Sequence, residues 1–480
     1  MQTGIVSVGA YLPRYRLPRD VVARSWERHA LKGEKSVANT DEDSLTMAVE
    51  AALICLEKAD PSMVDAVYFA SLTPPYCEKS QAGMVATVCD LAETTATADF
   101  ANSPRAGASA LKAALDNVGA GGARLALAVA GDTPLAFPKS DQEQLAGDAG
   151  AAALVGTENL AAVFRGHYAV NTEILDSWRM AGEDFCNTAE SRFATDKGYM
   201  TAMPRAVKGL LARASLAPSD IAKIVFTTPG LRENQQAAKK LGFAPDQVED
   251  SLMLHAGYCG AAQPLLLLAK ALENASPGQY VILAAYGTGA DAFLFQATER
   301  VAELAARASL GKSLEAGRPL TSYNRYLSFR GVLEAVPGEP FRTFPSTAAY
   351  WREQKSILRF YGSKCGNCGV IATPVNRICP NCAARDNFTE IRLANRKARV
   401  FTYSIDNLAG RSDDPVVVQT VCEDEEGTRY YLYMTDFDPQ AVRVGMEVEF
   451  TFRKIYVGGN YINYYWKCRP TGDAGGGACR

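Results

Sequence analysis

Four cysteines near the C-terminus have the spacing of a metal site. Cys365 and Cys368 form one C-x2-C pair, Cys379 and Cys382 form a second, and ten residues separate the pairs. Each pair can direct two thiolates at one ion, and four thiolates favour tetrahedral Zn2+ while leaving no open position for a substrate. We therefore predict a structural zinc site, with a rubredoxin-type iron site as the alternative, that lets a segment too small for its own core fold.

A second stretch with side chains that could take part in catalysis is His255-Ala-Gly-Tyr258-Cys259-Gly260. It precedes an apolar helix predicted over residues 261–272. Backbone N–H groups at such a helix start are expected to face an anion or an oxyanion. His255 is one of only three histidines and suits acid/base work near neutral pH. Tyr258 can exchange a proton with an oxygen, and Cys259 can serve as a nucleophile. The alternative for each side chain is ordinary packing.

Composition limits the class of protein. The chain has 480 residues, 48% of them hydrophobic, and a net charge of −3 from 50 Lys+Arg against 53 Asp+Glu. These values predict a globular protein of several domains with no field that attracts nucleic acid. We find no apolar run of the ~18 residues that a membrane span needs and no signal peptide, so we expect no membrane association and a cytoplasmic location. The other eight cysteines are scattered, unlike a disulfide scaffold.

Alternating strands and helices fill the first third of the chain and predict an α/β fold with a mostly parallel sheet covered by helices. The predicted strands are residues 4–12, 66–70, 95–100 and 124–130, and the predicted helices are 43–58, 81–91 and 105–117. The pattern then recurs: residues 61–69 match 218–226 at an offset of 157, and 124–133 match 279–288 at an offset of 155. Such near-equal offsets indicate a duplicated α/β half.

The composition changes near residue 337, where Pro337, Pro340 and Pro345 mark a linker over residues 337–355. The cysteine-containing zinc ribbon is predicted over 356–390. Five segments rich in Val, Thr, Tyr and Phe follow within 391–470, and their spacing predicts a small closed β-barrel such as an OB-fold. The Gly-rich tail, residues 471–480, is predicted to be disordered.

Two family resemblances cover nearly the whole chain. Residues 356–470 resemble the DUF35 family, a zinc ribbon followed by an OB-fold, through Tyr361-Gly-x-x-Cys-x-x-Cys…Cys-Pro-x-Cys382 and Val400-Phe-Thr-Tyr403. Residues 1–336 resemble the hydroxymethylglutaryl-CoA synthases of the thiolase superfamily. The stretches that carry this second resemblance are Gly4-Ile-Val-Ser-Val-Gly-Ala-Tyr-Leu-Pro13, Ala130-Gly-Asp-Thr133, Asp176-Ser-Trp-Arg179, Lys239-Lys-Leu-Gly242 and Ala285-Tyr-Gly-Thr-Gly-Ala290.

The resemblance implies a duplicated thiolase-like fold, a homodimer, an acyl-CoA substrate that brings coenzyme A into the site, and another enzyme of acyl-CoA metabolism as a candidate partner. The synthases' catalytic residues are not retained, however. Their acylated cysteine aligns with Pro104, their glutamate with Leu72, their histidine with Thr227 and an asparagine with Ala256. Ser103 and Pro104 instead suit a helix start, with serine as the N-cap and proline at the first helical position.

Other residues near these positions are candidates for the lost roles. Ser103 is a possible displaced nucleophile, and Glu78 is a carboxylate close to the lost glutamate position, although pairing with Lys79 would equally explain it. Arg105 is placed to meet a CoA phosphate or a substrate carboxylate. A basic face suited to the entrance for pantetheine, or simply to solvent, follows the Thr227 strand and consists of Arg232, Lys239 and Lys240.

These observations favour an enzyme that makes or cleaves a C–C bond of a CoA thioester, of aldolase or retro-aldolase type, without a covalent acyl-enzyme. Such a reaction needs a base and an oxyanion hole but no nucleophile. One alternative is a synthase or thiolase-like acyltransferase with a displaced nucleophile, Ser103 or Cys259. Another is an inactive scaffold subunit that stabilises a partner enzyme.

Overall fold

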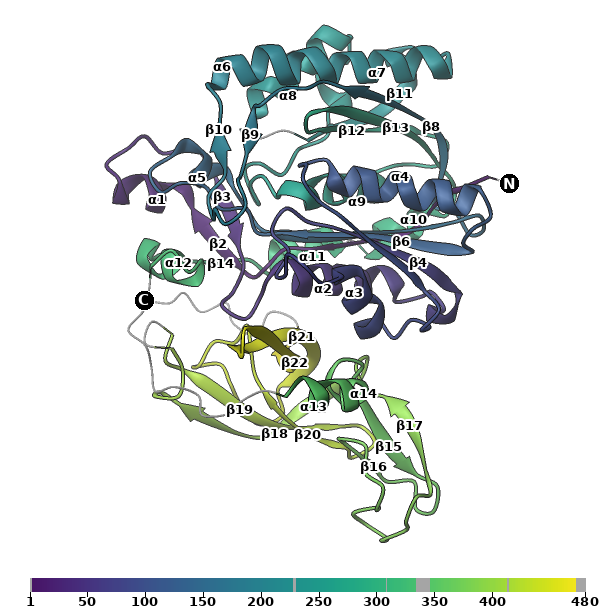
Figure 1. Cartoon of the computed structure of the whole chain (residues 1–480), viewed down its shortest axis with the longest axis vertical. Helices are drawn as coiled ribbons and strands as arrows, with labels where there is room; N and C mark the ends of the chain where they lie inside the picture. Colours follow the sequence, from purple (N-terminus) through teal and green to yellow (C-terminus); the bar gives the residue numbers. More distant parts are fainter. Residues whose placement is uncertain (1, 228–229, 308, 334–345, 412–413, 472–480) are drawn as a thin grey trace. The chain divides into compact units, whose positions relative to one another are not determined.

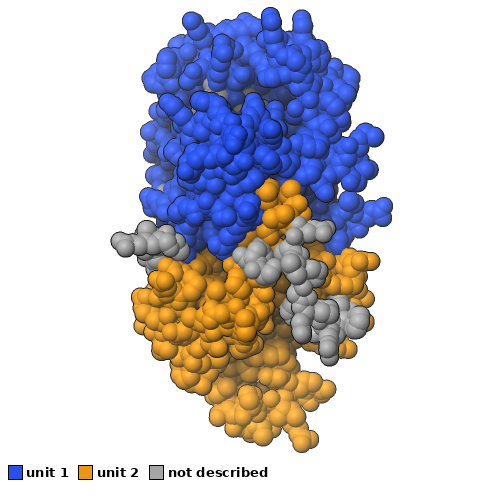
Figure 2. Space-filling view, turned by 90° about the vertical axis from the view of Figure 1, so that its left-hand side faces the viewer, with its two compact units in different colours: residues 1–326 blue, residues 327–480 orange. Residues whose placement is uncertain are grey.

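A computed structural model describes residues 2–227, 230–307, 309–333, 346–411 and 414–471 of the chain. They form two compact units, Met1–Tyr326 and Leu327–Arg480 (Figure 2). The division falls inside a helix, α12 (Tyr323–Phe329), ahead of the boundary that the sequence predicts. Residues 337–345 of the predicted linker and almost all of the predicted tail lie outside the described residues. No helix in the described ranges is both long and apolar enough to cross a membrane.

Unit 1 contains a nine-stranded sheet in the order β11-β12-β13-β8-β1-β7-β6-β4-β5. Its first half comprises β1 (Gly4–Tyr11), β4 (Val64–Ala70), β5 (Ala96–Phe100), β6 (Leu125–Asp132) and β7 (Ala149–Gly156), and its second half comprises β8 (Ala162–Asn171), β11 (Ile221–Phe226), β12 (Tyr280–Tyr286) and β13 (Gly289–Ala297). The halves meet where β1 pairs with β8.

Strand pairing repeats between the halves of this sheet. β4 and β6 are parallel, and so are β11 and β12. Their next neighbours, β7 and β13, run antiparallel in both cases. The prediction of a mostly parallel sheet is therefore wrong, because the strands in the middle of the sheet, β7, β1, β8 and β13, all pair antiparallel. In place of a second copy of β5, a single parallel bridge joins Ile224 to Val248. The repeat read in the sequence therefore corresponds to a repeat of topology, because β4 and β11, like β6 and β12, begin at matching offsets.

Helices lie on both outer faces and in the middle of unit 1 (Figure 1). Helices α4 (Ala106–Gly119) and α9 (Gln263–Glu273) contact each other and contribute to the same core cluster. α4 packs against strands of the first half, and α9 packs against strands of both halves. Every residue from Leu265 to Ala269 is fully buried, as expected for a helix that is apolar all round. The outer helices are α2 (Ser44–Leu56), α3 (Gln81–Val88), α7 (Met200–Ala214) and α8 (Leu231–Leu241).

Shorter elements complete unit 1. The three-stranded sheet β14-β2-β3 consists of Arg318–Pro319, Tyr15–Pro18 and Glu34–Val37. The connection between β8 and α7 carries β9 (Ser177–Trp178), β10 (Asn187–Thr188), α6 (Ser191–Phe193) and a π-helical turn, Ala194–Tyr199. The remaining helices are α1 (Arg19–Ser25), α5 (Asp141–Leu145), α10 (Val301–Arg307) and α11 (Ser309–Glu315), with 3-10 turns at Pro61–Met63, Pro218–Asp220, Pro245–Gln247 and Gly260–Ala262.

Unit 2 contains two sheets after the helices α13 (Thr347–Arg352) and α14 (Gln354–Ile357). The first has the order β16-β15-β17, and the second has the order β20-β19-β18-β21-β22. Their strands are β15 (Tyr361–Cys365), β16 (Ile371–Ala372), β17 (Phe388–Arg392), β18 (Lys397–Asp406), β19 (Val417–Asp424), β20 (Arg429–Tyr433), β21 (Glu447–Gly458) and β22 (Tyr461–Pro470). The last five overlap the five strands that the sequence predicts.

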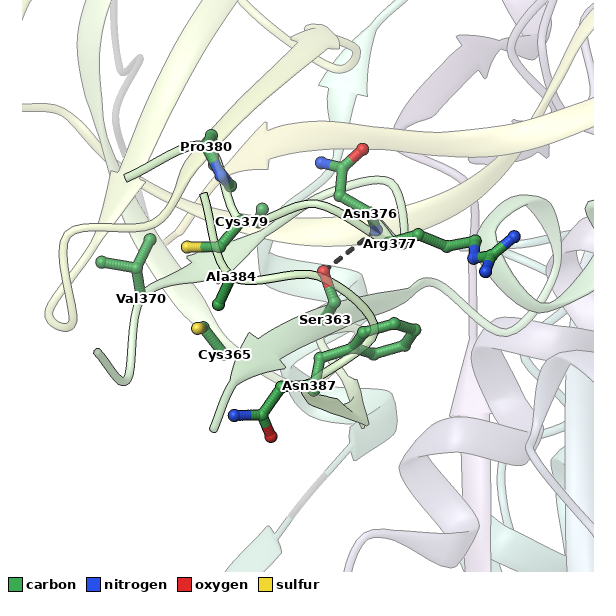
Figure 3. A pocket seen from close by; sticks show the side chains of 11 residues that line it. Ser363, Cys365, Val370, Asn376, Arg377, Cys379, Pro380, Ala384 and Asn387 are labelled. Carbon is green, nitrogen blue, oxygen red and sulfur yellow. Dashed lines mark hydrogen bonds between the residues drawn. The ribbon is translucent and has the colours of Figure 1, made fainter. Parts of the chain in front are cut away.

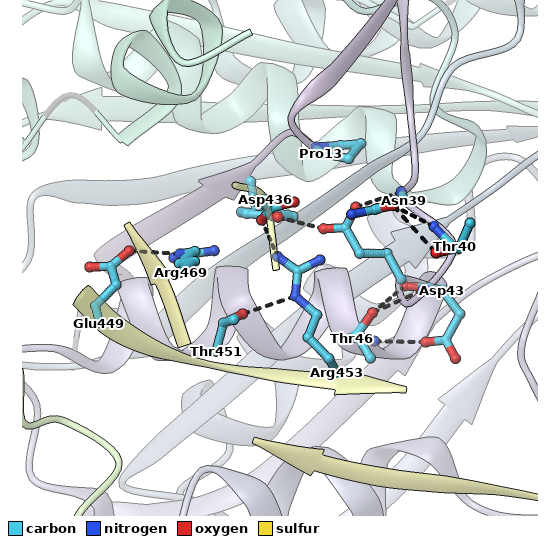
Figure 4. A network of polar contacts seen from close by, with 12 residues as sticks. Pro13, Asn39, Thr40, Asp43, Thr46, Asp436, Glu449, Thr451, Arg453 and Arg469 are labelled. Atoms are coloured by element: carbon cyan, nitrogen blue, oxygen red, sulfur yellow. Dashed lines mark hydrogen bonds and ion pairs between the residues drawn. The ribbon is translucent and has the colours of Figure 1, made fainter. Parts of the chain in front are cut away.

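The larger sheet of unit 2 curls so that its two ends approach each other. A parallel bridge joins Met434, just after β20, to Cys468 of β22. Aromatic side chains pack inside the curled sheet, where the ring of Phe360 stacks on that of Trp466 at 5.5 Å between centroids. On β21, the guanidinium of Arg453 donates hydrogen bonds to Asp436 at 2.8 Å and to the Thr451 hydroxyl at 3.1 Å (Figure 4).

Candidate active site and metal cluster

The turn before α4 holds the position where the resemblance expects a nucleophile, here Pro104. The helix begins at Ala106, and its N-cap residue is Arg105, which makes no side-chain cap bond. The prediction that Ser103 is the N-cap is therefore wrong, because the Ala106 amide bonds to the Ser103 carbonyl and closes a separate turn first. The Ser103 hydroxyl still accepts the Arg105 N–H at 3.3 Å, and it donates to the Gly287 carbonyl at 3.2 Å.

The loop after β12 connects this turn to a second expected catalytic position. Gly287 lies so close to the turn that a Cβ there would be 2.6 Å from the Ser103 hydroxyl and 2.9 Å from the Arg105 nitrogen. The preceding residue, Tyr286, donates its N–H to the Thr227 hydroxyl at 2.9 Å. Pro104 and Thr227, where the sequence predicts that the cysteine and the histidine of the resembling synthases are replaced, thus lie against the same loop.

Arg105 has a partner within the protein. Its guanidinium contacts Asp291 at 2.9 Å and the Thr288 carbonyl at 3.3 Å, and His167 Nε2 contacts the other oxygen of Asp291 at 2.9 Å. Burial alone would raise the pKa of Asp291, but the hydrogen bond from His167 and the charge of Arg105 outweigh it and lower that pKa. This ion pair competes with the phosphate or carboxylate contact that the sequence predicts for Arg105.

The anion expected at the start of the α9 region is a side chain of the protein itself. Asp132, at the end of β6, accepts the Ala261 N–H at 2.8 Å. Its other oxygen accepts the Leu72 N–H at 3.3 Å and the Thr73 hydroxyl. Gly260 makes room for it, since φ is +51° and a Cβ would lie 2.2 Å from the carboxylate. Asp132 is fully buried, and burial raises its pKa despite these bonds. One carboxylate thus joins three loops.

The His255–Gly260 stretch provides three different environments. The Cys259 thiol is fully buried, its pKa is raised by burial, and its amide is bound by Gln263 at 2.8 Å, so it is a poor nucleophile. Tyr258 is half-buried, and its pKa is raised by burial and then by the charge of Asp132, so its hydroxyl stays protonated near neutral pH. His255 is exposed.

Residues of the β8–α7 connection that were not predicted as site residues lie close to this stretch. The Tyr286 hydroxyl donates to Asp176 at 2.6 Å, and the Ser177 N–H binds the other carboxylate oxygen at 2.8 Å. Arg179 donates to the Leu72 carbonyl, at the expected glutamate position. The sequence signalled these residues only as members of two stretches that carry the family resemblance, 176–179 and 285–290. Their contact could not be foreseen, because Tyr286 lies 110 positions away from Asp176.

The remaining predicted site residues are exposed. Glu78 lies in the loop between β4 and α3, outside the contacts described above. On α8, Lys240 donates to the Met200 carbonyl at 3.2 Å, while Arg232 and Lys239 are also exposed. Their roles in acid/base chemistry and in binding pantetheine stay predictions.

The four predicted metal ligands converge in unit 2. The ligand atoms of Cys365, Cys368, Cys379 and Cys382 all lie within 4.8 Å of one another. Two Sγ–Sγ separations are 3.7 Å and 3.5 Å, close to the roughly 3.8 Å edge of a tetrahedron with Zn–S bonds of about 2.3 Å. Figure 3 shows Cys379 above Cys365 at one side of the pocket, while the Asn376 N–H donates to the Ser363 hydroxyl at 3.0 Å. The donor set and its spacing therefore fit zinc.

Both cysteine pairs have the same backbone turn. The Cys365 N–H bonds to the Val370 carbonyl, and the Cys379 N–H bonds to the Ala384 carbonyl, each at 2.9 Å. The residue after each pair, Gly369 or Ala383, has a positive φ of 74° or 57°. The Val370 N–H points at the sulfur of Cys368, and together with the Asn381 side chain it lowers the pKa of this thiol to about 6. The thiolate, which is the form that binds metal, is thus favoured.

Comparisons with known proteins identify relatives of the first part of the chain. The family described as 3-oxoacyl-[acyl-carrier-protein] synthase III C terminal matches residues 211–294. The hydroxymethylglutaryl-CoA synthase of Methanopyrus kandleri is 33% identical over 345 residues, which cover 69% of this chain and 98% of that protein. The corresponding synthase of Methanosarcina acetivorans is 34% identical over 347 residues, which cover 69% of this chain and 99% of that protein.

Solved structures show the same architecture. MvaS in complex with 3-hydroxy-3-methylglutaryl coenzyme A has a TM-score of 0.62 at 21% identity, covering 72% of this chain and 94% of that one. The HMG synthase of the curacin biosynthetic pathway has a TM-score of 0.63 at 16% identity, covering 82% and 100%. These likenesses confirm the thiolase-like α/β fold that the sequence predicts.

Proposed function

The chain belongs to the hydroxymethylglutaryl-CoA synthase family of the thiolase superfamily, and from this premise we propose that it makes or cleaves a C–C bond of a CoA thioester by aldol chemistry, without a covalent acyl-enzyme. The observation that carries the proposal is Pro104. It stands at the turn where the resembling synthases carry their nucleophile, and it has neither a nucleophilic side chain nor a backbone N–H. The turn itself is kept, with Ser103 hydrogen-bonded on both sides.

Retro-aldol cleavage of a β-hydroxyacyl-CoA needs two kinds of group. A base removes the hydroxyl proton as the C–C bond breaks, and hydrogen-bond donors stabilise the thioester enolate. Tyr258 suits the second task because burial keeps its hydroxyl protonated. The backbone at the two helix starts is less suited, since Ser103 accepts the Arg105 amide and Asp132 accepts the Ala261 amide. His255 and Glu78 remain the acid/base candidates that the sequence proposes.

The acyltransferase alternative would require a displaced nucleophile. The Ser103 hydroxyl donates to the Gly287 carbonyl and accepts the Arg105 N–H, and neither partner is a base that could activate it. The Cys259 thiol is fully buried. Both observations weigh against acyl transfer through these residues. The second alternative is an inactive scaffold subunit, and the four replaced catalytic positions support it. A measurement of turnover separates it from the proposed aldol enzyme, because only the enzyme would convert a substrate.

Unit 2 supports a further part of the proposal, a zinc ribbon followed by an OB-fold of the DUF35 type. The convergence of four thiols supports one structural zinc ion, and the strand order with its joined ends supports the barrel. We propose coenzyme A as a component of the substrate, and a homodimer formed through a sheet edge. A further enzyme of acyl-CoA metabolism is the proposed partner.

A panel of β-hydroxyacyl-CoA and β-ketoacyl-CoA thioesters, mixed with the full-length protein, tests the function. We expect released carbonyl and acyl-CoA products, together with an intact protein mass that stays unchanged during turnover. An increase in mass by an acyl group would favour the acyltransferase. Absence of any product would favour the scaffold. Tyr258→Phe should lower turnover by about 10²-fold, the usual size of a lost oxyanion-hole donor.

A further inference from the structure

We propose that Asp176 is the general base of this reaction and that Tyr286 is the residue that positions it. The inference rests on the proposed function and deepens it. In the step, Asp176 accepts the β-hydroxyl proton, the electrons of the breaking C–C bond pass to the thioester enolate, and a carbonyl product forms. The protonated Asp176 then returns its proton to the α-carbon of the enolate, which gives the acyl-CoA product and restores the base.

Position is the first reason for this assignment. Tyr286 ends β12, next to Gly287, which lies against the Ser103–Pro104 turn. The same tyrosine donates its backbone N–H to Thr227, the second replaced catalytic position. Its hydroxyl reaches Asp176 at 2.6 Å, so the carboxylate belongs to the same end of the sheet as both replaced positions.

The carboxylate is held in one orientation. Asp176 is 9% exposed, one oxygen accepts the Ser177 N–H at 2.8 Å, and the other accepts the Tyr286 hydroxyl. Each oxygen keeps a lone pair that can receive a substrate proton. A carboxylate fixed in this way loses little orientational freedom when the substrate binds, so ordering it for catalysis costs little entropy.

The Tyr286 hydroxyl occupies a space beside the neighbouring π-helical turn, Ala194–Tyr199. Gly198 in that turn leaves the space that the hydroxyl occupies, since a Cβ there would lie 2.1 Å from the oxygen. The ring of Tyr199 packs edge-on against Tyr286 at 5.3 Å between centroids. π-helical turns are rare and occur often at functional sites, so the one beside the Tyr286 hydroxyl favours a functional role for the Tyr286–Asp176 contact.

The other titratable groups that face Asp176 come from three elements. Tyr286 ends β12, Tyr258 precedes the α9 region, and Cys186 lies on the same connection as Asp176, near Arg179. Burial raises the pKa of Tyr258, Tyr286 and Cys186, so all three are protonated near neutral pH. Asp132, at the end of β6, also acts on Tyr258 and Cys186, but its two oxygens already accept the Ala261 and Leu72 N–H groups and the Thr73 hydroxyl. We therefore assign the role of proton acceptor to Asp176, with Tyr258 available as a donor to the enolate oxygen.

Steady-state kinetics of the full chain over pH 4–9 test the assignment. For a thioester that the native protein cleaves, Asp176→Asn should lower kcat by about 10²-fold or more while KM changes less than about threefold. Tyr286→Phe should retain more activity and move the acidic limb of the pH–rate profile to higher pH, because the ionised carboxylate loses a donor. Tyr68→Phe, which removes a hydroxyl bonded to Asn117 on the distant α4–β4 contact, is the matched control and should behave as the native protein.

The outcomes separate the two proposals. Cleavage by the native protein with full activity in Asp176→Asn would overturn the assignment of the base and leave the function standing. Cleavage by none of the proteins would overturn both. If Asp176→Asn does not fold, as judged by circular dichroism, Tyr286→Phe decides, and an acidic limb that does not move refutes the positioning role.

Discussion

Gly260→Ala is expected to destabilise unit 1 well beyond the usual cost of a glycine replacement. Gly260 has a φ of +51°, and a Cβ would lie 2.2 Å from a carboxylate oxygen of Asp132 and 2.9 Å from its carboxyl carbon. Asp132 is fully buried and holds the Ala261 amide at 2.8 Å. The new methyl group can be accommodated only if the carboxylate moves away from that amide.

The expected magnitude follows from two contributions. Placing alanine in the left-handed region costs about 1–2 kcal/mol. Losing a hydrogen bond to a buried charged group costs a further ~1.5–3 kcal/mol. We therefore expect a loss of roughly 2.5–5 kcal/mol in the free energy of unfolding. Gly121→Ala is the control, because Gly121 has a φ of +76° with nothing within 4 Å of an added Cβ, so it isolates the first contribution.

Urea unfolding followed by circular dichroism measures both variants on the same transition, because both glycines belong to unit 1. Gly260→Ala should lose at least ~1.5 kcal/mol more than Gly121→Ala, the smallest cost of the displaced hydrogen bond. Equal losses in the two variants would show that Asp132 is not seated against Gly260, and the account of the three joined loops would then be refuted.

Three further outcomes are expected. Metal analysis should find one zinc ion per chain, lost in Cys379→Ser but kept in Cys89→Ser, a buried cysteine of unit 1; zinc-free native protein would contradict the site. The pKa of Asp291 is lower in the folded protein than its ordinary value of 3.8, so its carboxylate should stabilise the fold above pH 3.8. This stabilisation should fade as the pH falls through the pKa of the folded state. Asp291→Asn should therefore flatten the acid side of a plot of melting temperature against pH. Light scattering at micromolar concentration should give a dimer, because β5 is the exposed edge of the nine-stranded sheet, and a monomer would count against pairing through that edge.

Features that depend on short stretches of chain could be predicted from the sequence. The four metal-binding cysteines are spaced by turn geometry, since each pair occupies one tight backbone turn. The repeated α/β half was visible because its two copies keep similar residues at nearly equal offsets. The five strands of unit 2 were predicted because alternating β-branched and aromatic residues mark a strand within its own length.

The polar contacts of the candidate site were decided only by the tertiary structure. Asp132 meets the amide of Ala261 across 129 positions, and Arg105 meets Asp291 across 186. The burial that raises the pKa of Tyr258 and of the Cys259 thiol likewise depends on neighbours that are distant in the sequence. The spacing of residues in a sequence carries no information about such pairs, because loops at one end of a sheet bring them together only after both halves have folded.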